Sequence, residues 1–559
     1  MQNKTKLVKD RKNTDKNDNQ VGFKKWIPML VLCLALMIII IDTTVLNVSL
    51  KTIIEDLNTD ITGIQWVITI YSLTLAAFTI TGGRLGDLYG RKKMFIVGAV
   101  IFAIGSFITS ISSTVGMMIA GESVIEGIGA AMMMPATASI LMTTYKGRDR
   151  AIAFGIWGGV AGAASALGPI IGGYLTTNYS WRWAFRINLV VVGLLLIGAI
   201  FIKESKEHIK KIKLDFVGIL LSSLGLLAFV YGIIESSSFG WIFAIKPYQI
   251  LGKDLIPFNF SISPVAMLIG IMLLTLFVFW EKRVEDAGKT PLVSLKIFKN
   301  SQFIVGASVS ALLSLGMVGL VFSLPVYLQT VHNLDALHTG LALLPMSIVV
   351  LVSAPLSGAI SKFVTAKRLI QLGLIFAFFG SIALHFSLSA TSTIGDLALG
   401  LMLFGLGMGL VMAQASNMTL SAVSVDESGE ASGVNNTFRQ IGSSFGSAII
   451  GAILLTTLSS SLIGGIKNSQ VIPDNFKSKI TQSVSQNASS VEFGNGQSKS
   501  NLPPEISNEI KRISNNASAE ASKKTFIATS IFIAFAFVMA SFLPNTKHFD
   551  KSARAVSTH

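Results

Sequence analysis

The sequence predicts an all-α polytopic membrane protein with fourteen membrane-spanning helices and both termini on the cytoplasmic side. Three observations lead to this prediction. Of the 559 residues, 51% are apolar and 13% are charged, whereas soluble domains carry roughly 25% charged residues. The apolar residues fall in runs of about 20, the length that crosses ~30 Å of hydrocarbon. Lys and Arg collect on one side of these runs, as they do in loops that face the cytoplasm.

This composition excludes several classes of protein. A soluble enzyme of several domains or a disordered chain would not be so apolar, and the single cysteine, Cys33, excludes an intrachain disulfide scaffold. The net charge of +15 is explained by cytoplasmic loops, so we expect no nucleic-acid partner. We find no Gly-rich phosphate loop and no Cys/His cluster at metal spacing. We therefore expect neither an enzyme nor an ATP-driven pump, and no cofactor or metal.

The predicted spans follow from the apolar runs in order. They cover 27–48, 63–83, 94–112, 117–142, 152–174, 184–202, 215–235, 263–280, 302–330, 338–360, 369–388, 394–417, 431–463 and 525–543. Two of them, 302–330 and 431–463, are long enough to extend past the bilayer or to tilt. Residues 1–26 have no apolar core and so are no signal peptide; they and residues 544–559 are predicted cytoplasmic tails.

The orientation follows from the loops. Eight Lys and Arg residues precede the first span, but the short loops that would face outside hold only four: Lys51, Arg182, Lys246 and Lys253. The long segment 465–524 is rich in Ser and Asn, and long segments cross largely regardless of charge. We expect it to be an external loop, either uninvolved and disordered or with short amphipathic helices near 473–487 and 504–517.

An internal repeat divides the chain. A shift of 278 superposes five glycine pairs, and a shift of 275 matches Gly83 to Gly358. The pairs at 278 are Gly127/Gly405, Gly129/Gly407, Gly155/Gly433, Gly168/Gly446 and Gly173/Gly451. The repeat predicts an N-terminal six-helix half over 27–203 and a C-terminal six-helix half over 302–543, joined by a linker over 204–301 that contains two inserted helices. Close helix packing would also explain many of these glycines.

Two motifs connect the chain to a known family. The loop Gly83-Arg-Leu-Gly-Asp-Leu-Tyr-Gly-Arg-Lys-Lys93 resembles the loop 2–3 signature of the major facilitator superfamily, and Gly168-Pro-Ile-Ile-Gly-Gly173 resembles its antiporter motif. With Asp42-Thr-Thr-Val-Leu-Asn47 and Gln65-Trp66, the chain resembles the 14-helix drug:proton antiporter family over 27–463.

The resemblance implies a function and a location. It implies proton-coupled export of amphipathic, often cationic, small molecules by alternating access. The protein would be a multi-pass monomer in the lipid bilayer of a bacterial cytoplasmic membrane, with protons as the energy source.

The resemblance also assigns roles to the two motifs. Gly83, Asp87, Gly90, Arg91 and Lys92 would form a conformational latch on the cytoplasmic side. Asp87 and Arg91 are four residues apart and can pair with each other or with a neighbouring helix end, although positive-inside anchoring would explain the basic residues alone.

The second motif would be a hinge or a seal against proton leak, formed by Gly168, Pro169, Gly172 and Gly173. Pro169 lacks a backbone donor, so a simple packing kink is the alternative.

Three carboxylates are predicted at membrane depth, where each is a candidate functional group. Asp42 lies in the span 27–48, and Glu122 and Glu126 lie four residues apart in 117–142. All three fall in the outer half of the membrane, and the resemblance places their two helices side by side around the cavity. Removal from water and a neighbouring carboxylate both favour the protonated form, so proton and cationic drug could compete for Asp42. The family's arginine is replaced by Ser123, which leaves Glu122 or Glu126 as alternative proton carriers.

Other polar residues could line the cavity: Asn47, Asn435, Arg439 and Gln440. Three other functions stay open at this point. One is a lipid or glycolipid flippase on the same scaffold, with Arg186 and Arg439 at a head-group site. Another is a non-transporting sensor or partner protein that binds through 465–524. The third is a facilitator that works without protons.

Overall fold

The computed structural model describes most of the chain. The described residues are 23–59, 61–204, 215–245, 248–250, 253–254, 259–361, 363–424, 427–474, 476–478, 481 and 503–545. These residues are almost entirely helical, which confirms the predicted all-α class. A hairpin of two-residue strands, β1 (Gln249–Ile250) and β2 (Lys253–Asp254), is the exception among them.

The first part of the chain forms six long helices. They are α2 (Ile27–Asp56), α3 (Ile61–Tyr89), α4 (Arg91–Ser110), α6 (Gly127–Thr144), α7 (Gly147–Asn178) and α8 (Arg182–Gly198). The short α5 (Val115–Met118) and a π-helix, η2 (Ile119–Glu126), lead directly into α6. Short 3₁₀ turns stand at Phe23–Trp26 (η1) and Ala199–Phe201 (η3).

The later part repeats this order after an intervening pair. That pair is α9 (Phe216–Phe239) and α10 (Ile262–Asp286), and a 3₁₀ turn, η4 (Ile297–Lys299), follows it. The long helices that follow are α11 (Ser301–Val331), α13 (Leu344–Ile360), α14 (Ala366–Ser387), α15 (Ile394–Leu420), α16 (Ser428–Asn468) and α19 (Pro504–Ser541). A short helix, α12 (Ala336–Ala342), precedes α13.

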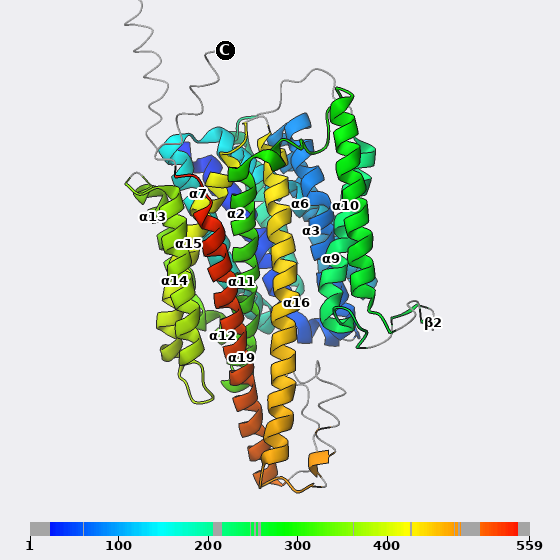
Figure 1. Cartoon of the computed structure of the whole chain (residues 1–559), viewed down its shortest axis with the longest axis vertical. Helices are drawn as coiled ribbons and strands as arrows, with labels where there is room; N and C mark the ends of the chain where they lie inside the picture. Colours follow the sequence, from blue (N-terminus) through cyan, green and yellow to red (C-terminus); the bar gives the residue numbers. More distant parts are fainter. Residues whose placement is uncertain are drawn as a thin grey trace, which may run out of the picture.

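Twelve helical segments of the described chain are long and apolar enough to cross a membrane, and they coincide with twelve of the predicted spans. The other two predicted spans, 152–174 and 338–360, fall on α7 and on α12–α13, where α13 is apolar but has only 17 residues. The number fourteen therefore stays a prediction. The helix α2 begins and α19 ends at the same end of the bundle (Figure 1), and that this end faces the cytoplasm is also a prediction.

The two halves have matching internal contacts. In the first half α4 packs on α6 and α8, and α2 packs on α7; in the second α14 packs on α15 and α19, and α11 packs on α16. The glycine pairs found in the sequence also make equivalent contacts in the two halves. A Cβ on Gly129 would meet Phe102 of α4 at 2.4 Å, and one on Gly407 would meet Ala377 of α14 at 2.4 Å. Such contacts require glycine because the helix backbones approach closely.

The inserted helices pack at one edge of the bundle. α9 and α10 contact each other, and α9 also contacts α3 and α16, one from each half (Figure 1). The Ser223 hydroxyl of α9 donates to the Ala77 carbonyl of α3 at 2.9 Å. The pair therefore lies beside the junction of the halves rather than between them.

A helical hairpin projects from the opposite end. α16 has 41 residues and α19 has 38, which at 1.5 Å per residue makes each roughly 60 Å long, about twice the hydrocarbon thickness. Both run together well beyond the other helices (Figure 1). The expected helix near 504–517 is therefore present, but as the first part of α19 rather than as a separate element. Most of 473–487 and all of 482–502 lie outside the described residues.

A small apolar core holds this hairpin together. Apolar residues recur on α16 every four positions and face a matching set on α19, the spacing that forms one helix face. The set is Leu454, Leu458, Leu462 and Ile466 on α16, with Ile506, Ile513, Ala517 and Ala521 on α19. The expected loop is thus an ordered extension over its described part.

Candidate functional site

The motif over 83–93, which the sequence predicts as a loop, forms the end of α3, Gly90 and the start of α4, and it joins the two halves of the bundle. Asp87 is fully buried, and its carboxylate accepts hydrogen bonds from Arg91 Nε at 3.0 Å and Nη2 at 2.7 Å. It also accepts from the backbone N–H groups of Gly429 at 3.0 Å and Glu430 at 2.7 Å. The predicted pairing of Asp87 with Arg91 is confirmed.

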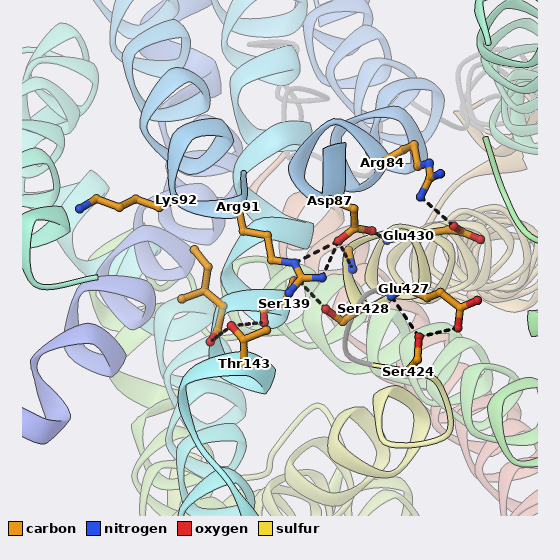
Figure 2. Close-up of polar contacts among 12 residues, drawn as sticks. Arg84, Asp87, Arg91, Lys92, Ser139, Thr143, Ser424, Glu427, Ser428 and Glu430 are labelled. Carbon is orange, nitrogen blue, oxygen red and sulfur yellow. Dashed lines mark hydrogen bonds and ion pairs between the residues drawn. The ribbon is translucent and has the colours of Figure 1, made fainter. Parts of the chain in front are cut away.

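The Asp87 side chain caps the N-terminus of α16, a helix in the other half. A helix N-terminus exposes unsatisfied N–H groups and the positive end of its dipole, which an acidic side chain normally caps. The N-cap residue of α16, Glu427, makes no such side-chain bond. The carboxylate of α3 supplies it instead, from a residue more than 340 positions away in sequence (Figure 2). We call Asp87, Arg91, Gly429 and Glu430 the latch.

Neighbouring contacts extend the latch. Arg84 Nη1 lies 3.5 Å from Glu430 Oε2, and Glu430 Oε1 accepts a hydrogen bond from the backbone N–H of Ser294. The hydroxyls of Ser139 on α6 and Ser428 on α16 are 2.8 Å apart (Figure 2). None of these partners was identified from the sequence, because their proximity depends on how the two halves meet.

The glycines of the motif allow this approach. A Cβ on Gly83 would lie 2.3 Å from the Gly429 carbonyl, and one on Gly429 would lie 2.4 Å from Asp87 Oδ1. Gly90 has a φ of +112°, a conformation that L side chains rarely adopt. Lys92 extends away from Asp87 (Figure 2), and its backbone N–H donates to Glu204 at 3.1 Å. The side chain of Lys92 therefore takes no part in the described latch contacts.

The three candidate carboxylates meet inside the first half. Asp42 on α2 and Glu122 and Glu126 on η2 are 3%, 0% and 0% exposed, and one carboxylate oxygen of each lies within 4.8 Å of the others. α2 continues to Asp56 instead of ending near 48, so Asp42 lies near the middle of its helix. We call these residues the acid triad.

Two polar residues of neighbouring helices bind the triad. Ser106 on α4 donates to Glu126 at 2.6 Å. Asn188 on α8 donates to Asp42 at 2.9 Å and lies 3.3 Å from Glu126. Four triad oxygens remain buried without a hydrogen-bond partner among the described residues, including both of Glu122. Sequence reasoning missed Ser106 and Asn188, because a single small polar residue in an apolar span carries no distinctive pattern.

A π-helix carries two members of the triad. In a π-helix each backbone hydrogen bond spans five residues instead of four. Such turns are rare in proteins overall, but many of those that occur lie at functional sites. Glu122 and Glu126 lie at the middle and the end of η2. Ser123, which stands where the family carries arginine, donates to the Val67 carbonyl of α3 at 2.7 Å.

The triad can hold protons. Three ionised carboxylates this close would repel one another strongly at a buried site, so the site favours states in which they share protons, as in other carboxylate pairs. Three oxygen ligands at this spacing also meet the geometric needs of a cation. The expectation that the chain has no metal site stays a prediction.

The antiporter motif packs within the first half. A Cβ on Gly168 of α7 would lie 1.7 Å from Thr44 Oγ1 of α2, and one on Gly172 would lie 2.9 Å from Val45. Gly173 is buried, and the side chain of Pro169 lies outside the described part of the structure. The motif therefore sets the distance between α2, which carries Asp42, and α7.

We expect Gly168→Ala to slow transport at least 10-fold and to lower the melting temperature. The added methyl group would overpack the contact with Thr44, which typically costs about 1–3 kcal/mol. Transport in proteoliposomes and thermal melting of the purified protein check this. Gly451→Ala is the matched control, because a Cβ there meets nothing within 4 Å. Equal effects of both substitutions would contradict the role of the α2–α7 contact.

A small central cavity lies between the halves. Its volume is about 20 Å³, and it is lined by α7, α11, α15 and α16, including Arg439. Asn435 is buried, with its Oδ1 unpartnered among the described residues, and Gln440 is half-buried. The side chain of Asn47 lies outside the described part. The residues that line this cavity include Arg439 but no triad member, and the role of the triad in substrate binding stays a prediction.

Two matching helical halves, a polar contact between them at one end and ionisable groups buried inside define the class of secondary transporters. The chain belongs to the Major Facilitator Superfamily, whose family model matches residues 32–447. It is therefore a multi-pass membrane transporter and not an enzyme, as the sequence predicts.

Its relatives are resistance and export proteins. The tetracenomycin C resistance and export protein of Streptomyces glaucescens is 30% identical over 77% of this chain and 76% of its own length. The methylenomycin A resistance protein of Bacillus subtilis is 29% identical, over 76% and 87%. The multidrug efflux pump LfrA of Mycolicibacterium smegmatis is 27% identical, over 77% and 81%.

Solved structures show the same fold. The proton:xylose symporter XylE matches with a TM-score of 0.54 at 12% identity, covering 94% of this chain and 98% of that one. The human organic anion transporter MFSD10 matches with a TM-score of 0.53 at 12% identity, covering 92% and 99%.

Proposed function

We propose that the protein is a proton-coupled antiporter that exports small amphipathic compounds across a bacterial cytoplasmic membrane as a monomer. The observation that carries this proposal is the acid triad, since three fully buried carboxylates within 4.8 Å of one another are expensive unless they bind and release protons. The resistance and export relatives supply the direction of transport and the class of substrate.

Alternating access would use the latch. With Asp87 on the α16 N-terminus, the halves contact each other at that end. Breaking these bonds would let the first half rock against the second and open the central cavity to the predicted cytoplasmic side. Re-forming the latch bonds would close the cytoplasmic end, so that substrate would leave the cavity at the opposite end of the bundle.

Protons and substrate would bind at different places. The triad lies among α2, α4, η2 and α8, whereas the cavity is lined by α7, α11, α15 and α16. Proton release from the triad would reach the cavity through α7, which contacts α2 at Gly168 and lines the cavity at Trp157. This coupling would be indirect, and direct competition of proton and drug for Asp42 stays the alternative.

Two of the three alternatives have a structural feature in their favour. A lipid flippase has Arg439 in the central cavity in its favour, and a partner-binding protein has the projecting hairpin of α16 and α19 in its favour. Neither alternative uses the acid triad.

We expect proteoliposomes with the purified protein to accumulate more radiolabelled tetracenomycin C than protein-free liposomes when an inside-acidic pH gradient is imposed. The probe is chosen because a relative is a tetracenomycin C resistance and export protein. A protonophore should reduce accumulation at least 10-fold, and an internal pH dye should report proton release on addition of drug.

Accumulation that ignores the gradient would contradict proton coupling while leaving export intact. Movement of a fluorescent lipid between leaflets, without movement of the drug, would favour the flippase. Loss of a cellular phenotype on deletion of 469–503, with drug transport intact, would favour the partner-binding protein.

A further inference from the structure

The central cavity contains one charge. Of its eleven lining residues, Arg439 alone is charged, and the others are apolar side chains, glycine and serines. Arg439 lies nine residues after Glu430 of the latch, about 14 Å along α16 at 1.5 Å per residue. It is therefore inside the predicted span 431–463, where an arginine is costly and by default functional.

Arg439 has no counter-ion among the described residues: no ion pair and no hydrogen bond of its side chain is found there, and the acid triad does not line its cavity. A guanidinium group carries five N–H donors in a planar fork that matches a carboxylate or phosphate. The cavity thus presents an uncompensated positive charge.

A second donor without an acceptor lines the same cavity. Trp157 on α7 is 2% exposed, and its indole Nε1–H has no hydrogen-bond partner among the described residues. A buried donor that lacks a partner costs about 1–3 kcal/mol, so a ligand that accepts from it would be favoured. Arg439 and Trp157 come from opposite halves, which lets one ligand bind to both.

The rest of the lining suits an apolar body. Met317, Met408 and Met412 line the cavity, and methionine side chains adapt to varied shapes and contact aromatic rings favourably. At about 20 Å³, the cavity has room for about one water molecule in this conformation. A substrate would enter when the halves move apart.

We propose that the central cavity selects amphipathic anions, whose carboxylate or equally charged group binds Arg439 and Trp157 and whose aromatic or apolar body packs on the methionines. This rests on the proposed export function and names its substrate class. It replaces the expected preference for cations, because a cation would meet Arg439 and no carboxylate in this cavity.

Equilibrium binding to the whole protein in phosphatidylcholine nanodiscs tests the proposal without any proton gradient. Three probes share one aromatic frame: anthracene-2-carboxylate, anthracene-2-carboxamide and anthracen-2-ylmethylammonium. Competition against the tritiated carboxylate, with empty nanodiscs as background, gives three affinities. We expect the carboxylate to bind at least 10-fold tighter than the other two.

Variants locate the preference. Arg439→Gln should weaken carboxylate binding about 10- to 100-fold, the range for a lost charge-assisted hydrogen bond, and should leave carboxamide binding within about 3-fold. Arg439→Lys should regain part of the loss, and Trp157→Phe should weaken carboxylate binding about 3- to 10-fold. Arg512→Gln is the matched control, because Arg512 lies on the hairpin and pairs with Glu509.

Equal affinities in the native protein, tighter binding of the ammonium probe or no binding of any probe would each overturn the proposal. So would an Arg439→Gln protein that keeps the carboxylate preference. If Arg439→Gln fails to elute as a folded monodisperse protein, the native affinities and Trp157→Phe decide. Because no gradient is imposed, failure of proton coupling would leave these results unchanged.

Discussion

An Asp87→Asn variant is expected to lose most of its closed contact at the latch and at least 10-fold of its transport rate. The substitution removes the negative charge that pairs with Arg91 and weakens two bonds to the α16 N-terminus. Losing a hydrogen bond between charged groups costs about 2 kcal/mol, which corresponds to a roughly 30-fold shift in the conformational equilibrium. The shift is toward states in which α3 and α16 separate.

Cross-linking measures this shift directly. Ser139→Cys and Ser428→Cys place two thiols across the halves at a position where the hydroxyls are 2.8 Å apart. The background is clean after Cys33→Ser, because Cys33 is the only cysteine in the chain. We expect rapid disulfide formation on mild oxidation with Asp87 present and a several-fold lower rate with Asp87→Asn.

Asp396→Asn is the matched control for this experiment. Asp396 also caps a helix, but it accepts from Thr393 at the start of its own α15 and does not join the halves. The control should cross-link at the rate of the parent. An unchanged rate in Asp87→Asn would show that the latch contacts do not set the conformational equilibrium.

The latch shows how far the sequence reaches. Asp87 and Arg91 are four positions apart in one chain segment, so their pairing follows from local geometry. A contact with a neighbouring helix end was also expected, but nothing in the sequence near Gly429 or Glu430 indicates that this helix would be α16. The internal repeat gave a partial indication, because its matched glycines make equivalent contacts with the other half. Gly83 lies against the Gly429 carbonyl, and Gly358 lies against the Ala151 carbonyl.

The three members of the acid triad could be predicted from the sequence, but their position and their surroundings could not. The cost of a carboxylate at membrane depth singled out Asp42, Glu122 and Glu126, and the structure brings all three together. The π-helical turn of η2 and the partners Ser106 and Asn188 have no sequence signal. The central cavity was also missed apart from Arg439, because Trp157 and the methionines look like ordinary apolar residues of a span.

The triad also supplies the sharpest test of proton coupling. A Glu122→Gln variant is expected to raise the melting temperature by a few degrees and to reduce proton-coupled drug accumulation at least 10-fold. Neither oxygen of Glu122 accepts a hydrogen bond from Ser106, Asn188 or another described residue outside the triad, so the amide loses no bond of that kind. It removes one buried acid from a crowded cluster and adds N–H donors toward Asp42 and Glu126. Active sites often trade stability for function in this way.

The measurement combines thermal melting of the purified protein with gradient-driven uptake in proteoliposomes. Glu126→Gln is the informative comparison, because Glu126 accepts from Ser106 at 2.6 Å. We expect Glu126→Gln to lose coupled uptake as well, but without the gain in melting temperature. Glu520→Gln, an exposed acid on the hairpin, should change neither quantity.

The signs of the two effects separate a functional acid from a structural one. If Glu122 served only to hold α2 against η2, its replacement would lower the melting temperature and reduce uptake together. If Glu122 carries protons, its replacement should raise the melting temperature and reduce proton-coupled uptake. Both effects have one cause, because the repulsion among the buried carboxylates destabilises the folded protein and also lets the site release a proton. A lower melting temperature with uptake still driven by the gradient would assign the proton to Asp42 or Glu126 instead.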